Sequence, residues 1–267
     1  ADLGADVIKV ERPGSGDDTR GWGPPFLKDR AGHDTAEAAY YLGTNRNKRS
    51  VTIDIATPEG QDLVRRLADT ADVVIENFKV GDMARYGLDA ATLRATRPRL
   101  VYCSITGFGQ TGPYSQRAGY DFVIQAMGGL MSITGQSDDQ PGGGAQKCGV
   151  PISDLMTGMY ASVAIVSALF ERTRSGQGQY IDMSLLDTQV AWLANQASNY
   201  LVSGTTPKRW GNAHPNLAPY QAFAASDGEL IVAVGNDRQF ASLCRVLGAA
   251  NLADDERYAT NARRLSQ

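Results

Sequence analysis

The sequence predicts an α/β fold that contains a parallel sheet and is followed by the beginning of a second domain. Short apolar strands at residues 6–11, 72–77 and 100–105 alternate with helical segments, which is typical of βαβ units. The segment 203–219 is rich in glycine and proline and precedes a hairpin signal. The chain has 267 residues, 42% of them hydrophobic, which is enough to form a core without a disulfide or a metal.

Local signals predict the elements of the first part. Residues 6–11 are rich in β-formers and run into a Pro-Gly turn. Thr57 and Pro58 begin a helix as its N-cap and first helical residue, and Leu63 is expected on the inner face of that helix. The strands at 72–77 and 100–105 follow, and parallel sheets bind their ligands at the carboxyl ends of such strands.

The second half of the chain is predicted in the same way. The segment 154–172 is apolar nearly all round and is therefore expected to be a buried helix, too short for a membrane span. Residues 180–184 form a strand, and a helix follows to about residue 202. Ser226-Asp227-Gly228 predicts a hairpin turn, with a helix at 238–247 after it. These signals divide the chain into a large domain (1–202), a linker (203–219) and an incomplete small domain (220–267).

Composition excludes several classes of protein. The 26 basic and 29 acidic residues give a formal charge of −3, which argues against nucleic acid or an anionic membrane as the partner. The cysteines, Cys103, Cys148 and Cys244, fit neither a disulfide framework nor a metal motif, and the two histidines disfavour a zinc site. A reducing, cytoplasmic location is the default expectation. The segment Gly14–Thr19 lacks the third glycine of a G-x-G-x-x-G motif, and neither a P-loop nor a G-x-S-x-G motif is present.

Asp154 is the main candidate for chemistry. It stands between a strand-like segment and the start of the apolar helix, where an aspartate most often serves as an N-cap. The functional alternative is a carboxylate nucleophile at the positive end of a helix. Gly158, one turn later, leaves the same face without a side chain.

Ligand-binding candidates follow the predicted strands. Arg12 ends the first strand, where a phosphate would bind, and Asn77 and Phe78 end the next, where they can hydrogen-bond and stack on a planar ring. Asp121 and Gln125 share one face of a helix. Most of the remaining basic set is expected on the solvated surface: Arg20, Arg46, Lys48, Arg49 and Arg85. The roles of His33, His214 and the glycines 142–144 stay open.

Several segments resemble the family III CoA-transferases: residues 1–14, 45–50, 57–60, 76–78 and 119–121, together with Asp154 and its glycine-bearing helix. That group includes formyl-CoA transferase, the carnitine CoA-transferases and α-methylacyl-CoA racemase. The match runs in order over essentially the whole chain. It implies a Rossmann-like large domain joined to a smaller one, two chains interlocked as a homodimer, and family segments at both ends that lie outside this sequence. On this reading the 267 residues are inactive alone.

The resemblance also implies roles for single residues. Asp154 matches the catalytic aspartate, Arg12 and Arg85 match residues that bind the nucleotide end of CoA, and Asn77 and Phe78 line its path. In addition, Asp121 lies where formyl-CoA transferase has an active-site glutamate, and Tyr120 lies where the racemase branch has a histidine.

The implied reaction transfers CoA from an acyl-CoA to a carboxylic acid, without a metal or a tightly bound cofactor. It proceeds through an anhydride and a CoA thioester of Asp154, with N–H groups at the helix start as the expected oxyanion donors. The alternatives are a racemase-like enzyme, which Tyr120 disfavours, and a non-catalytic CoA-binding module.

Overall fold

The computed structural model describes residues 1–267 and divides them into two compact units. The first unit comprises residues 1–118 and 158–184, and the second comprises 119–157 and 185–267. The predicted linker, 203–219, lies within the second unit. The division into a large domain, a linker and a small domain stays a prediction. The α/β class with parallel sheets is confirmed.

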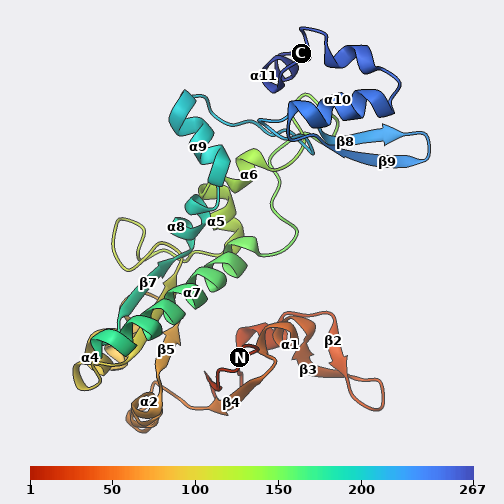
Figure 1. The fold of residues 1–267 in the computed structure, drawn as a ribbon. Coiled ribbons are helices and arrows are strands. Elements are labelled where there is room, and N and C mark those ends of the chain that lie inside the picture. Colours follow the sequence, from red (N-terminus) through yellow and green to blue (C-terminus); the bar gives the residue numbers. More distant parts are fainter. The chain divides into compact units, whose positions relative to one another are not determined.

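The first unit is built on two parallel sheets and one short antiparallel pair (Figure 1). Its strands are β1 (Val7–Glu11), β2 (Phe26–Lys28), β3 (Asp34–Ala38), β4 (Lys48–Thr52), β5 (Val73–Glu76), β6 (Val101–Thr106) and β7 (Tyr180–Ser184). Its helices are η1 (Asp18–Gly21), α1 (Ala39–Asn45), α2 (Pro58–Thr70), α3 (Asp82–Arg85), α4 (Ala90–Thr96) and most of α7 (Ile152–Ser175). Strand β1 pairs with β4, and β6 lies between β5 and β7.

This strand order corrects one expectation. We expected the strand that ends at Arg12 to be a neighbour of the strand that ends at Asn77, but β1 and β5 belong to different sheets. Chain order predicted the adjacency, whereas hydrogen bonding pairs β1 in register with β4, Val7 opposite Lys48 and Glu11 opposite Thr52. Arg12 and Asn77 therefore do not lie on adjacent strands.

In helix α2, local residues determine where the helix begins, and packing determines which face is buried. The Thr57 hydroxyl accepts the Gly60 N–H at 3.1 Å, as expected for the N-cap, and Pro58 is the first helical residue. The prediction of the inner face is wrong by one residue: Leu63 is 45% exposed, whereas Val64 and Ala68 pack into the core. That core consists of Ala68, Leu88, Leu93, Leu100 and Tyr102.

The second unit is mostly helical and ends in a hairpin with helices after it. Its elements are α5 (Asp121–Met127), α6 (Leu130–Ile133), the first turn of α7, α8 (Leu185–Ala191), α9 (Ala194–Ser203), β8 (Tyr220–Ala225), β9 (Gly228–Ala233), α10 (Asp237–Val246), η2 (Ala250–Ala253) and α11 (Asn261–Leu265). The predicted hairpin is confirmed, with a two-residue turn between Ala225 and Gly228. A small core of Val234, Phe240 and Cys244 lies beneath it.

Helix α7 is not buried all round, contrary to our expectation. One face is buried through small residues, with Ser153, Thr157, Ala161 and Ala168 at most 3% exposed. The large apolar side chains point the other way, and Met159, Val163, Val166 and Phe170 are 60–69% exposed. Small residues allow close packing on one face only, which composition does not reveal. At 24 residues the helix is also longer than expected: it is long and apolar enough to span a membrane, which corrects the expectation that it is too short, although core helices of soluble proteins pass the same test.

Candidate active site

The first turn of α7 is capped by a carboxylate from another helix. Asp121, the first residue of α5, accepts the backbone N–H of Ser153 at 2.8 Å and that of Asp154 at 3.4 Å through the same oxygen. Its other oxygen accepts the side-chain amide of Gln125 at 2.7 Å, and the Gln125 carbonyl accepts the Cys148 N–H at 2.8 Å. Asp121 therefore caps the helix, which is the role that the sequence offered for Asp154 as the alternative to catalysis.

The Asp154 carboxyl is left without a hydrogen-bond or ion-pair partner. Its pKa is raised to about 6, mainly because the surrounding protein removes water from the carboxyl and secondly because the Asp121 carboxylate repels its charge. Part of the residue remains exposed to solvent. At Gly158, one turn further along, a Cβ would meet no atom within 4 Å. Asp154 is thus an accessible carboxylate that is mostly ionised at neutral pH and more basic than usual.

A buried polar cluster fixes the turn on which Asp154 stands. The Ser153 hydroxyl donates to the Gln189 side chain at 2.5 Å, and both residues are 1% exposed. The Thr157 hydroxyl donates to the Ser153 carbonyl at 2.6 Å and contacts the Thr188 hydroxyl at 2.7 Å. These contacts join α7 to α8. The sequence did not predict these hydrogen bonds, because isolated serine, threonine and glutamine residues in helices do not indicate which residues they bond to.

The expected oxyanion donors are not free. The Ser153 and Asp154 N–H groups bind Asp121, the Ile152 N–H binds the Val150 carbonyl and the Leu155 N–H binds the Pro151 carbonyl. Capping and turn formation therefore use all four donors of the first turn. This corrects the expectation, and an oxyanion formed at Asp154 needs donors from elsewhere.

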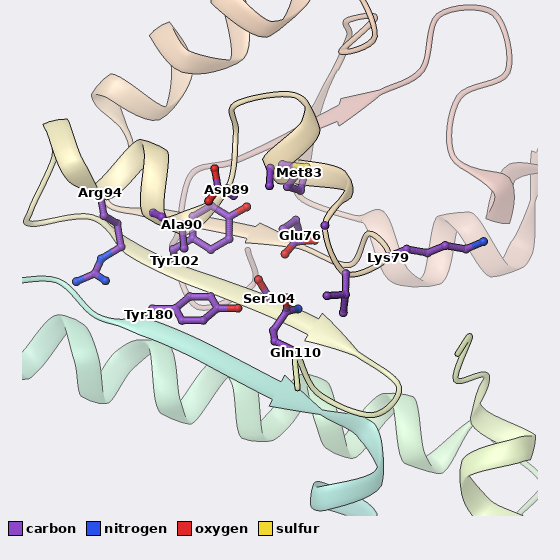
Figure 2. A pocket seen from close by; sticks show the side chains of 14 residues that line it. Glu76, Lys79, Met83, Asp89, Ala90, Arg94, Tyr102, Ser104, Gln110 and Tyr180 are labelled. Atoms are coloured by element: carbon purple, nitrogen blue, oxygen red, sulfur yellow. The ribbon is translucent and has the colours of Figure 1, made fainter. Parts of the chain in front are cut away.

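The first unit holds a cavity of about 480 Å³ lined by the end of β5, by Tyr102 and Ser104 of β6 and by Tyr180 at the start of β7 (Figure 2). Figure 2 shows Glu76, Ser104, Tyr102 and Tyr180 around this cavity, while the Lys79 side chain extends away from it. Burial raises the pKa of Glu76, although hydrogen bonds from Ser104 and from the Phe78 N–H oppose the rise. Cavities of about 300–1,000 Å³ are the usual size for small-molecule sites.

None of the four predicted CoA-binding residues is in the lining of this cavity. Asn77, Phe78 and Arg85 are exposed neighbours of the lining residues in sequence, and Arg85 contacts Asp82 and Tyr86. Arg12 is exposed after β1, with no side-chain partner. The structure thus leaves all four available to solvent, and their contact with a nucleotide stays a prediction.

Among the basic residues expected on the surface, Arg20 is held by carboxylates of the protein. It binds both oxygens of the Glu11 carboxylate, at 2.8 and 3.0 Å, and also Glu37. Glu11 is 4% exposed and accepts further hydrogen bonds from Ser50, Tyr41 and the Asp17 N–H. Arg20 is therefore a structural residue.

Tyr120, the predicted substrate-binding residue next to Asp121, is 69% exposed.

Comparison with known proteins gives this geometry its context. The family described as CoA-transferase family III matches residues 1–267. The chain belongs to CoA-transferase family III. Within the family, it is 59% identical over 266 residues to a succinate–glutarate CoA-transferase of Agrobacterium fabrum, a match that covers 100% of the chain and 65% of that protein. It is 47% identical over 260 residues to a human succinyl-CoA:glutarate CoA-transferase, a match that covers 97% of the chain and 57% of that protein.

Solved structures of similar proteins agree with the fold. A CaiB/BaiF family protein from Brucella suis matches with a TM-score of 0.81 and 58% identity, covering 99% of the chain and 68% of that protein. A Mycobacterium tuberculosis protein matches with a TM-score of 0.82 and 32% identity, covering 98% of the chain and 67% of that protein. The chain spans 57–65% of the length of the two curated relatives described above.

Proposed function

We propose that this family III chain is the nucleophile-bearing part of a CoA-transferase that moves CoA from an acyl-CoA to a carboxylic acid. The observation that supports this most directly is the state of Asp154: its carboxyl is unpartnered, with a pKa raised to about 6, while Asp121 caps the helix in its place. A carboxylate kept for structure is paired, and its pKa falls. A carboxylate kept for nucleophilic attack needs to be free, ionised and basic.

The proposed reaction has four steps at Asp154. Its carboxylate oxygen attacks the thioester carbonyl of acyl-CoA, the C–S bond breaks, and CoA thiolate leaves a mixed anhydride behind. The thiolate attacks the aspartyl carbonyl and releases the donor acid, which leaves an aspartyl-CoA thioester. The acceptor carboxylate attacks that carbonyl and displaces the thiolate. The thiolate then attacks the acyl carbonyl of the new anhydride, giving the new acyl-CoA and free Asp154.

Asp121 has a double part in this proposal. As a cap it fixes the turn on which Asp154 stands, and as a neighbouring charge it raises the energy of the Asp154 carboxylate. That charge repulsion is lost when Asp154 becomes an anhydride or a thioester, both of which are neutral at this position. The arrangement therefore favours acylation over the resting carboxylate.

The names of the relatives support small dicarboxylates, such as succinate and glutarate, as the acids. For the CoA moiety we propose Arg12 and Arg85 as contacts of the nucleotide end and Asn77 and Phe78 as contacts along its path. The interlocked homodimer remains a prediction from the family resemblance, and the cytoplasmic location remains a prediction from the cysteine pattern.

The test is to trap the acylated enzyme. The full-length protein is incubated with succinyl-CoA and hydroxylamine, and peptides are analysed by mass spectrometry. A hydroxamate at Asp154, absent from an Asp154→Asn variant, is the expected result. α-Hydrogen exchange without a hydroxamate indicates a racemase instead, and CoA binding without either indicates a binding module.

A further inference from the structure

Two segments whose roles the sequence left open meet in the second unit. The Gly211 N–H donates to the Gly135 carbonyl at 3.1 Å, and the Gly144 N–H donates to the Gln136 carbonyl at 3.4 Å. Gly211 has a positive φ of 58°, and a Cβ there would lie 2.5 Å from the Gln136 side chain. The positive φ favours glycine and a Cβ would displace the Gln136 side chain, so the loop that contains His214 is anchored beside Gly135 and Gln136, to which Gly144 is also bonded.

The loop after Gly211 is also held on its other sides. The His214 N–H donates to the Tyr220 carbonyl at 2.9 Å. The Asn216 side chain exchanges hydrogen bonds with Asn199 of α9 at 3.0 and 3.3 Å, and its backbone carbonyl accepts the Asn261 amide of α11 at 2.9 Å. A loop braced from α9, β8 and α11 can present side chains in fixed positions.

The imidazole of His214 has a defined orientation. Its Nδ1 accepts the Asn216 backbone N–H at 3.0 Å, so the hydrogen of the neutral ring is on Nε2. The ring packs against Tyr220, with 5.2 Å between the ring centres. Nε2 has no protein partner and remains a free hydrogen-bond donor.

A cavity of about 310 Å³ lies at this loop. Besides His214 and Tyr220, its polar lining is formed by the side-chain amides of Asn195, Gln196 and Asn212. None of these three amides has a protein hydrogen-bond partner, and no acidic side chain lines the cavity. The cavity is open to solvent, its amides and imidazole can each offer an N–H donor to it, and no carboxylate in its lining would repel an anion.

We propose that this cavity binds a carboxylate group of the acceptor acid, with His214 Nε2 and the amides of Asn195, Gln196 and Asn212 as donors. The inference rests on the proposed function. A dicarboxylate acceptor attacks with one carboxylate, so its second carboxylate has to be held elsewhere by the protein. The cavity lies in the same compact unit as Asp154, and its donor set recognises carboxylates without a metal or a fixed positive charge.

Direct binding provides the first test. The 267 residues contain two histidines, and His33 lies in the other unit with its side chain 79% exposed, so it serves as an internal control once both resonances are assigned with His214→Gln and His33→Gln variants. The full-length protein with ¹⁵N-labelled histidine is titrated with glutarate, with butyrate and with CoA. We expect glutarate to shift the His214 Nε2 resonance saturably, butyrate to shift it less, and His33 to stay unchanged. A shift with CoA but not with glutarate would overturn the proposal.

Kinetics provide the second test. His214→Ala and Asn212→Ala are expected to raise the KM for glutarate by about 10- to 100-fold, the effect of losing a hydrogen bond to a charged group. His214→Gln, which keeps a donor, is expected to recover part of the loss, and His33→Gln serves as the matched control. The succinyl group of the donor also has a free carboxylate, so hydroxamate formation is measured at saturating succinyl-CoA, where the Asp154 hydroxamate should still form in all four variants. An unchanged KM with normal hydroxamate formation refutes the carboxylate site alone, whereas no hydroxamate in the wild type refutes the proposed function.

Discussion

Replacing Asp154 by asparagine is predicted to stabilise the protein at neutral pH while removing its activity. The pKa of Asp154 is raised from its ordinary value of 3.8 to about 6. Between these two pH values the folded state keeps a proton that the unfolded state has lost, so the free energy of unfolding falls as pH rises. Above pH 6 the full penalty is present, and below 3.8 it is absent. Asparagine has no charge and escapes the penalty.

The magnitude follows from the same two values. One unit of pKa corresponds to about 1.4 kcal/mol, so full conversion gives roughly 3 kcal/mol. Because the side chain is partly exposed, solvent screening reduces the expected gain to about 1 kcal/mol, or about 2–4 °C in Tm. By the titration curve, about a third of the gain should remain at pH 4.5. Loss of the nucleophile should lower kcat by more than about a thousandfold.

The assay is thermal unfolding of the full-length protein at pH 7.5 and 4.5, with CoA transfer measured in parallel. Glu229→Gln is the matched control, because this exposed carboxyl in β9 has no ion pair or hydrogen bond and its loss should not change Tm. If Asp154→Asn is no more stable than the wild type at pH 7.5, or gains equally at both pH values, the reasoning about Asp154 is wrong.

Three further predictions concern single residues. Asp121→Asn should lower the pKa of Asp154, and the acid limb of kcat/KM should move to lower pH; an unmoved limb contradicts the role of the Asp121 charge. Glu11→Gln should cost about 3 kcal/mol in urea unfolding at neutral pH, because it leaves the Arg20 guanidinium without its buried partner. The pKa of Glu11 is depressed, so this contribution is full above the unfolded pKa of 4.5 and shrinks as pH falls below it; a cost that does not depend on pH counts against the ion pair. Gly178→Ala should cost about 1–3 kcal/mol, since a Cβ there would lie 2.1 Å from the Leu100 carbonyl oxygen; unchanged urea unfolding would show that the backbone adjusts freely.

The sequence predicted what depends on local signals. The Thr57 cap, the Ser226–Asp227 turn and the apolar strands need only neighbouring residues, so they were found at their positions. The sequence also selected Asp154 and Asp121 as candidates, and it left capping and catalysis as alternatives for Asp154. A cap is defined by which N–H groups an oxygen reaches, and a linear sequence does not contain that information.

Tertiary structure decided everything that depends on a distant partner. It assigned the cap to Asp121, whose oxygen reaches across 32 and 33 residues of chain, and thereby left Asp154 unpaired. It also placed β1 beside β4 rather than β5 and took the helix-start N–H groups away from oxyanion binding. The physical reason is the same in each case. Composition and periodicity determine which groups can be buried or hydrogen-bonded, whereas the partner of each group is determined only when packing brings remote segments within about 3 Å.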